Sequence, residues 1–158
     1  MSEEKVLKIN KIADGIVIDH INPGAALEVL SVLKINGRDK LTVSVLMNVP
    51  SRKDGTKDIV KVENRKLAKK ELDLISIVSP NATINVIEKF EIKDKFSVKI
   101  PREVMGIIKC SNQNCVTNSR EPVESSFKVE TEKGHENFRC HYCERTMDIR
   151  EVRESLMK

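Results

Sequence analysis

Four cysteines constrain this chain more than any other feature of its sequence, because all of them lie between positions 110 and 143. They occur as Cys110-x4-Cys115 and, after 24 further residues, Cys140-x2-Cys143. Two close pairs separated by a loop can place four sulfurs at the corners of a tetrahedron, which is how structural zinc sites are built. The spacing therefore predicts one structural Zn²⁺ ion bound by Cys110, Cys115, Cys140 and Cys143.

Two disulfides, a redox-active cysteine pair and an iron site are the alternatives. Disulfides require an oxidising compartment, whereas the first residues, Met1 to Val6, contain no apolar run long enough for a secretion signal. A catalytic zinc ion usually has three protein ligands and keeps one position open for water. Four cysteines leave no open position, so His135 and His141 are interpreted as surface groups or as groups that contact a metal ligand.

The distribution of cysteines favours two domains, residues 1–100 and residues 101–158. The first carries most of the Ile, Leu and Val and can bury a core unaided. The second is too short for a robust core, so a bound metal is expected to contribute folding free energy there. Because the second half contains ten Lys or Arg and ten Asp or Glu, the whole net charge of +4 lies in the first half. The N-terminal half is therefore the one expected to attract an anion.

Composition narrows the class of protein and its partners. With 39% hydrophobic and 33% charged residues the chain reads as a soluble globular protein, and no segment reaches the ~18 apolar residues of a membrane span. We expect a cytoplasmic location. Nucleic-acid binding needs an excess of basic residues to bind phosphates, but the cysteine-containing half is neutral. It also needs aromatic side chains that stack on bases, and the chain has only four Phe, one Tyr and no Trp. A protein partner is favoured, and a nucleic-acid-binding zinc ribbon is the alternative.

The N-terminal half shows an alternation of strand and helix patterns. Residues 1–14 could form an edge strand or an arm. Strands are predicted at 15–21, 41–49, 57–63 and 82–87, with a more broken extended segment at 90–100. One helix is predicted from Asn22, as N-cap, until Asn36-Gly37 ends it, and a second from about Leu67 to Ile77. This order is the βαββαβ arrangement of ferredoxin-like sheets, in which helices cover one face and leave the other for a ligand.

The C-terminal half shows short alternating segments at 126–131, 138–140 and 147–152. They predict a small all-β zinc ribbon whose strands end in the two metal-holding turns. The whole chain is thus predicted to be an α+β protein, a ferredoxin-like sandwich followed by a four-cysteine ribbon.

No catalytic constellation is present in the sequence. The cysteines are assigned to metal, and neither a glycine-rich phosphate loop nor a Ser, His and Asp set at recognisable spacing occurs. Lys57 and Lys61 point to one face of their strand, although most such lysines are only solvated. Asp19 and His20 interrupt a β-branched strand, so they must reach the open face or carry a partner. Binding or regulation is favoured over catalysis.

Together these motifs closely resemble the regulatory chain of aspartate carbamoyltransferase over nearly the whole length. The matching stretches are Gly15-x-Val17-Ile18-Asp19-His20-Ile21, Asn48-Val-Pro50-Ser51, Lys57-Asp58-x-x-Lys61-Val62-Glu63-Asn64, Pro80-x-Ala82-Thr83-Ile84-Asn85, Cys110-x-Asn112-x-Asn114-Cys115, Glu121-Pro122-Val123-x-Ser125-Ser126-Phe127 and Cys140-x-Tyr142-Cys143. The cysteine ribbon joined to the Val-Ile-Asp-His-Ile strand and the two-lysine strand makes this resemblance specific.

The resemblance implies a non-catalytic adaptor of pyrimidine biosynthesis. It implies an N-terminal domain that pairs into a regulatory homodimer and binds CTP, ATP and in some members UTP. It also implies a zinc domain that holds the catalytic chain, in a dodecamer of two catalytic trimers and three regulatory dimers. The effector-binding residues that it implies are Lys11, Ile12, Asp19, His20, Lys57, Lys61, Asn85, Ile87, Phe90, Ile92 and Lys95.

Three positions depart from the pattern of familiar family members. Asn10 replaces a glutamate, Lys11 an alanine and Phe90 a tyrosine. The first two change the charge of the expected pocket, and the third removes a phenolic hydrogen bond. They bear on nucleotide preference rather than on the fold or the zinc site.

Overall fold

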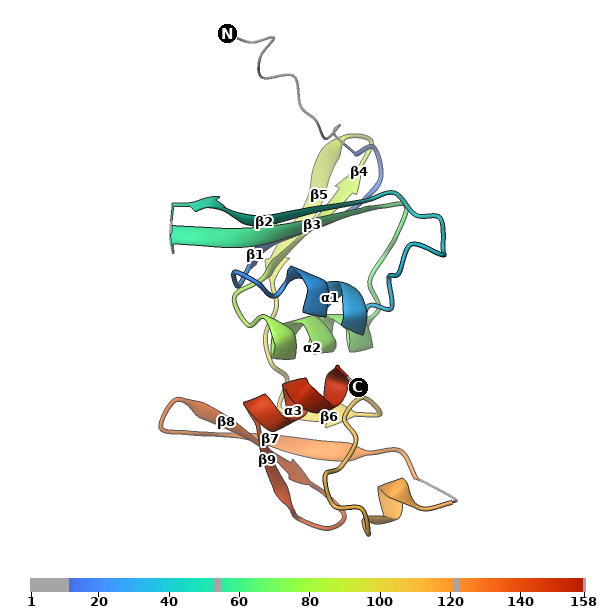
Figure 1. Ribbon diagram of the computed structural model, residues 1–158, viewed down its shortest axis with the longest axis vertical. Coiled ribbons are helices and arrows are strands. Elements are labelled where there is room, and N and C mark those ends of the chain that lie inside the picture. The colour runs from blue at the N-terminus through green and yellow to red at the C-terminus, as the bar shows by residue number, and fades with distance from the viewer. Residues whose placement is uncertain (1–11, 53–54, 121–122, 158) are drawn as a thin grey trace, which may run out of the picture.

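The structure is a computed structural model that describes residues 12–52, 55–120 and 123–157. It forms two antiparallel sheets with three α-helices, which confirms the predicted α+β class (Figure 1). The first sheet has the order β2-β3-β1-β4-β5 and the second the order β6-β7-β8-β9. The predicted edge strand or arm at residues 1–14 lies largely outside the described residues.

Five strands and two helices make up the N-terminal part of the fold. The strands are β1 (Gly15–Ile21), β2 (Val43–Ser51), β3 (Gly55–Glu63), β4 (Thr83–Glu88) and β5 (Glu91–Ser97), and the helices are α1 (Ala26–Val32) and α2 (Lys69–Val78). Both helices cover the same face of the sheet (Figure 1). Part of the segment predicted to be extended but broken, 90–100, forms β5, which pairs with β4 with a register shift between Val86 and Ile87.

Alternation along the strands builds the core of this sheet. Ile16, Ile18 and Ile21 of β1 are almost fully buried and pack with Val29 of α1 and Ile75 of α2. Val17, between Ile16 and Ile18, faces away from the helices, as period-2 alternation requires. One face of the sheet therefore packs on a hydrophobic core, and no helix of residues 12–52, 55–120 and 123–157 covers the other face.

The first helix begins three residues later than predicted. Asn22 was expected to cap it, but residues 22–25 form a turn in which the Ala25 N–H donates to the Asn22 carbonyl over 2.9 Å. The N–H groups at the start of α1 are satisfied instead by a distant side chain, since Ala26 donates to the carboxylate of Asp58 over 3.1 Å. Tertiary structure thus supplies the cap that local sequence was expected to supply.

The second strand continues two residues past its predicted end. Pro50 pairs with Thr56 inside the β2–β3 ladder. β2 is an edge strand, where proline removes no hydrogen bond that the sheet needs.

The C-terminal part contains the four short strands β6 (Glu103–Met105), β7 (Ser126–Glu132), β8 (His135–Cys140) and β9 (Thr146–Asp148), a 3₁₀ turn η2 (Val116–Asn118) and the helix α3 (Ile149–Leu156). The prediction that 147–152 is a strand is wrong beyond Asp148, so this part is not all-β. Asp148 accepts the Glu151 N–H over 2.8 Å, and Glu151 accepts the Asp148 N–H over 3.3 Å. This reciprocal capping box starts a helix at Ile149 and overrides the short alternation.

A second hydrophobic cluster lies between this sheet and the helices. It contains Phe127, Phe138 and Val152 together with Ile77, which belongs to α2 of the first part. Leu156 of α3 packs against both clusters. The helix α3 accordingly lies between α2 and the second sheet (Figure 1). Among the helices of the described residues, none is both long and apolar enough to span a membrane.

Candidate metal centre and polar sheet face

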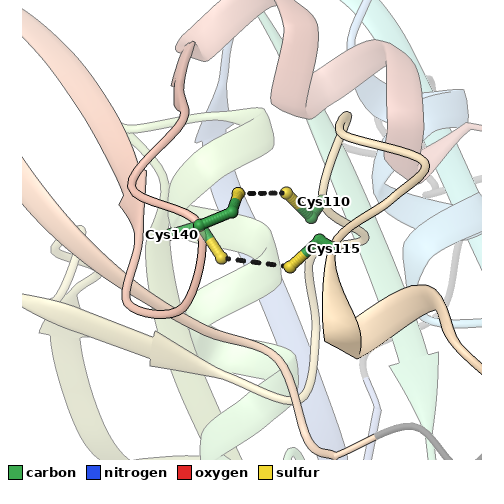
Figure 2. Close-up of side chains that lie close together, drawn as sticks. Cys110, Cys115 and Cys140 are labelled. Atoms are coloured by element: carbon green, nitrogen blue, oxygen red, sulfur yellow. Dashed lines mark hydrogen bonds between the residues drawn. The ribbon is translucent and has the colours of Figure 1, made fainter.

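The four cysteines converge at one end of the second sheet. Their sulfur atoms all lie within 4.8 Å of one another. The Sγ atoms of Cys110 and Cys143 are 3.6 Å apart, as are those of Cys115 and Cys140. Figure 2 shows the three labelled side chains converging on one point. A tetrahedron with metal–sulfur bonds of about 2.3 Å has edges of about 3.8 Å, so this spacing fits one bound ion. A disulfide would need about 2.05 Å between sulfurs.

Two hydrogen-bonded turns position these sulfurs. In the first, the Asn118 amide donates to the carbonyls of Cys110, over 3.0 Å, and Asn112, over 2.8 Å. In the second, the Cys140 N–H donates to the Arg145 carbonyl and the Glu144 N–H donates to the Cys140 carbonyl, each over 3.0 Å. The β7–β8 hairpin then brings the two turns together, although 24 residues separate the pairs in the sequence.

Burial and hydrogen bonds move the pKa values of the four thiols in different directions. Burial raises the pKa of Cys110 to about 12 and also raises the pKa of Cys140. Burial acts in the same direction on Cys143 and Cys115, but hydrogen bonds offset it there: the pKa of Cys143 falls to about 7, and bonds from Thr117 lower that of Cys115. A divalent ion would stabilise all four sulfurs as thiolates. The donor set therefore fits a thiolate-bound metal.

The two histidines that were predicted not to bind the metal do not belong to this cluster. The metal-ligand group found among the described residues consists of the four cysteines alone. His135 is exposed at the start of β8, and His141 is exposed with its Nδ1 3.4 Å from the Ser126 hydroxyl. Their interpretation as surface groups agrees with this placement.

A polar row crosses the helix-free face of the first sheet. In the strand register Lys61 lies opposite Val17, Val17 opposite Asn85, and Asn85 opposite Lys95. Directly opposed residues point to the same face of a sheet. Asn85 is buried and donates to the Val17 carbonyl over 3.4 Å, whereas Lys95 is exposed. Three of the predicted site residues are thus placed in line across four strands.

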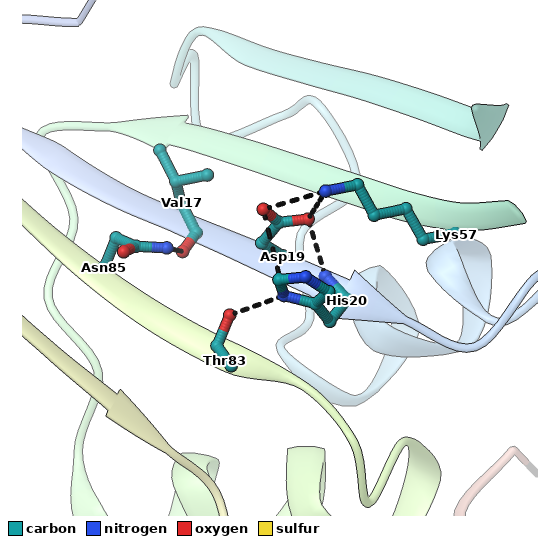
Figure 3. Close-up of polar contacts among 6 residues, drawn as sticks. All are labelled: Val17, Asp19, His20, Lys57, Thr83 and Asn85. Carbon is teal, nitrogen blue, oxygen red and sulfur yellow. Dashed lines mark hydrogen bonds and ion pairs between the residues drawn. The ribbon is translucent and has the colours of Figure 1, made fainter. Parts of the chain in front are cut away.

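Asp19, His20 and Lys57 form a cluster at the end of the same face (Figure 3). The Lys57 ammonium lies 2.9 Å and 3.2 Å from the two oxygens of Asp19. Burial raises the pKa of Asp19, but hydrogen bonds from Lys57 and the His20 N–H outweigh it and lower the pKa. His20 Nδ1 lies 3.2 Å from the hydroxyl of Thr83, a neighbour that the sequence analysis did not single out as a site residue.

A β-bulge explains why Asp19 and His20 lie side by side. Strict alternation would turn His20 onto the buried face with Ile18. The β1–β3 register instead shifts between Ile18 and Ile21, so that both isoleucines face the core and one extra residue is inserted. His20 takes the left-handed conformation, with φ 55°, and points out beside Asp19.

The remaining predicted residues are more scattered. Ile12 and Ile87 are buried but belong to neither core cluster, while Phe90 and Ile92 are 64% and 60% exposed at the β4–β5 turn. Lys11 lies outside the described residues. The structure therefore brings together the charged and amide members of the predicted set, whereas the apolar members divide between buried and exposed positions.

A cleft of about 280 Å³ adjoins the Asp19 cluster. It is lined by His20, Ile21, Asn22, Pro23, Ser51, Thr56, Lys57 and Asn81. Most of these residues were missed by the sequence analysis, because they come from the β1–α1 turn, the β2–β3 hairpin and the segment before β4. Of the residues that line the cleft, only His20 and Lys57 were predicted from the sequence as site residues.

Comparison with known proteins matches both halves of the chain to the same family. Residues 7–99 match a family model described as the aspartate carbamoyltransferase regulatory chain, allosteric domain, and residues 102–153 match the metal binding domain of the same chain. The sequence is 55% identical over 152 residues to the aspartate carbamoyltransferase regulatory chain of Thermoplasma volcanium, covering 96% of this chain and 99% of the relative. It is 50% identical over 143 residues to that of Archaeoglobus fulgidus, covering 90% and 94%.

Proposed function

This chain belongs to the aspartate carbamoyltransferase regulatory chain family, and from that premise we propose that it binds nucleoside triphosphates on its first sheet and docks on catalytic trimers through its metal-binding part. The family confirms the resemblance inferred from sequence and makes the chain a regulatory rather than a catalytic subunit. Residues 1–100 would form the effector domain and residues 101–158 the docking domain.

The polar row with the adjoining Asp19 cluster carries the proposal. Four basic side chains lie on the sheet face that no helix of the described part of the chain covers: Lys57, Lys61, Lys95 and His20. The excess positive charge of the chain belongs to the same half. Ammonium groups bind phosphate oxygens as point charges, and a surface of one sign draws anions from solution. A triphosphate is the ligand that this face suits.

The family resemblance implies how the parts of the nucleotide would be distributed over this face. Lys95, His20 and Lys57 would face the triphosphate. Asp19 and Lys61 would lie near the ribose and base, with Asn85 between them. The apolar members Ile12, Ile87, Phe90 and Ile92 would frame the base, together with Lys11. CTP, ATP and UTP are the expected effectors.

Zinc is the ion that we propose for the four-cysteine centre, one per chain. Four thiolates in a closed tetrahedral shell are typical of structural zinc and leave no position for catalysis. The ion would hold the two metal-binding turns in the shape that contacts the catalytic chain. Two catalytic trimers and three regulatory dimers, in the cytoplasm, would make the complete assembly.

Effector control follows if nucleotide affinity differs between two quaternary states. Such coupling is typically about 1–3 kcal/mol, and it must be reciprocal. Aspartate analogues bound to the catalytic chains would therefore change the affinity of the regulatory chains for nucleotide.

Calorimetry with CTP, ATP and UTP tests the effector site. We expect Lys95→Ala to weaken binding of each nucleotide, since a phosphate contact is lost. Lys69→Ala is the matched control, because it removes the same charge from α2 on the opposite side of the sheet. Equal affinities for wild type and Lys95→Ala would contradict the assignment of Lys95.

Assembly tests the docking part. A thiol-reactive mercurial with a chelator should remove the ion, unfold the metal-binding turns and release the catalytic trimers. A dodecamer that stays intact without metal would contradict this role.

A further inference from the structure

Asp58 is a fully buried carboxylate next to the proposed phosphate-binding lysine. Its relative exposure is 0%, and alternation along β3 turns it to the core face with Val60 and Val62, whereas Lys57 points to the open face. A buried carboxylate is costly unless it is hydrogen-bonded. Asp58 accepts three backbone N–H groups: from Gly24 over 2.9 Å, from Ala26 over 3.1 Å and from Asn48 over 2.9 Å.

These three donors adjoin the two walls of the 280 Å³ cleft, although none of them lines it. Gly24 and Ala26 lie one and three residues after Pro23, which lines one wall together with Asn22. Asn48 lies in β2, three residues before Ser51, which lines the other wall. Because one oxygen holds the first wall and the other oxygen holds the second, a single carboxylate fixes their separation.

Both strands that pair with β3, β1 and β2, have an irregular register close to Asp58. The β1–β3 register shifts between Ile18 and Ile21, and the β2–β3 register shifts between Leu46 and Val49. Each bulge contains a non-glycine residue in the left-handed region, His20 with φ 55° and Asn48 with φ 58°. Such conformations cost free energy and persist only where the surroundings hold them. The bond from Asn48 to Asp58 is one such restraint.

We propose that Asp58 is a positioning residue for anion binding in this cleft, acting through the two walls and through the β1 bulge that turns His20 outward, next to Lys57 on β3. This inference rests on the proposed function, because it assumes that phosphate oxygens bind beside Lys57 and His20. Asp58 itself touches no ligand.

Asp58→Asn is the informative substitution. The amide keeps the shape of the carboxylate and one acceptor oxygen, but its NH₂ group must face a backbone N–H of one wall. Either orientation therefore releases one wall. If the fraction of molecules with a correctly shaped cleft falls to about a tenth, the apparent Kd for CTP or ATP rises about tenfold.

Ile75→Ala separates positioning from plain stability. Ile75 is fully buried in the same core but does not line the cleft. We expect it to lower the melting temperature while leaving the Kd, measured where the protein is folded, within about twofold of wild type. We also expect the ring resonances of His20 to shift in Asp58→Asn and not in Ile75→Ala. An unchanged Kd and unshifted His20 resonances in Asp58→Asn would overturn the proposal.

Wild-type protein gives a second measurement that does not depend on a variant folding. Saturating CTP or ATP should slow hydrogen exchange of the Gly24, Ala26 and Asn48 amides together, because a ligand that needs the fixed walls stabilises them in turn. Exchange unchanged at all three amides would refute the idea.

Inorganic tripolyphosphate distinguishes a failure of the proposed nucleotide binding from a failure of the proposed role of Asp58. Binding of tripolyphosphate but of no nucleotide would remove the nucleotide assignment and leave the role of Asp58 to be measured with this probe. Binding of neither would remove both.

Discussion

Ile75 and Ile77 lie two residues apart on α2, yet they support different parts of the protein. Both are fully buried, Ile75 in the cluster of the first sheet and Ile77 in the cluster that contains three of the cysteines. Truncation of either to alanine removes three carbons, worth about 2.4 kcal/mol of transfer free energy. The cavity that is left adds to this, so the expected loss is about 2–5 kcal/mol in each case.

The consequence of Ile77→Ala should be loss of metal affinity. If metal binding is coupled to folding of the metal-binding part, a loss of about 3 kcal/mol there weakens the apparent affinity roughly a hundredfold. Ile75→Ala should cost similar stability but lower mainly the transition of the first sheet. For parts of this size, about 3 kcal/mol corresponds to roughly 12–24 °C in melting temperature.

Competition with a chromophoric chelator measures the metal affinity, and differential scanning calorimetry measures the thermal unfolding transitions. The two variants are matched in chemistry and helix, so each serves as the control for the other. If Ile77→Ala released metal no more readily than Ile75→Ala, the assignment of Ile77 to the metal-binding core would be refuted.

Three further predictions concern single residues. Gly15→Ala should destabilise the first sheet strongly, because an added Cβ would lie 2.2 Å from the Val62 carbonyl oxygen and because Gly15 has φ +148°. Urea titration measures the loss of stability, and an unchanged unfolding midpoint would contradict the prediction. Asp148→Ala should cost about 0.5–2 kcal/mol through loss of the α3 cap, seen as a lower thermal midpoint, while Glu132→Ala at an exposed position should not. The lowered pKa of Asp19 means that its ion pair stabilises the fold above the unfolded value near 3.8 and that this stability is lost as pH falls through the folded value. Wild type should therefore exceed Asp19→Asn in stability at pH 6, and the difference should shrink in acid; a constant difference across this range would count against the pair.

Local sequence was sufficient where one pattern dominated. The strand Gly15–Ile21 was predicted with its observed bounds, because glycine and an Asn-Pro-Gly turn enclose a β-branched run. The metal centre was predicted from two short cysteine spacings, since each pair lies in one turn. Where two patterns competed, as at 147–152, alternation was chosen although the Asp148 and Glu151 capping pair was already visible.

Asp58 marks the limit of such reasoning for the first sheet. The sequence analysis singled out Lys57 and Lys61 on this strand but not the buried Asp58, and the sequence could not show which donors would satisfy its carboxylate. Gly24 and Asn48 lie 34 and 10 residues away along the chain.

The sequence by itself determined the family, the four cysteines that cluster, most strands and the half of the chain that carries the positive charge, because each depends on residue type at short spacing. Tertiary structure alone decided the alignment of Lys61, Asn85 and Lys95, the pairing of Asp19 with Lys57 and the walls of the cleft. Those features depend on strand register and on two bulges. A shift of one residue in register turns every side chain to the opposite face, and no local pattern records it.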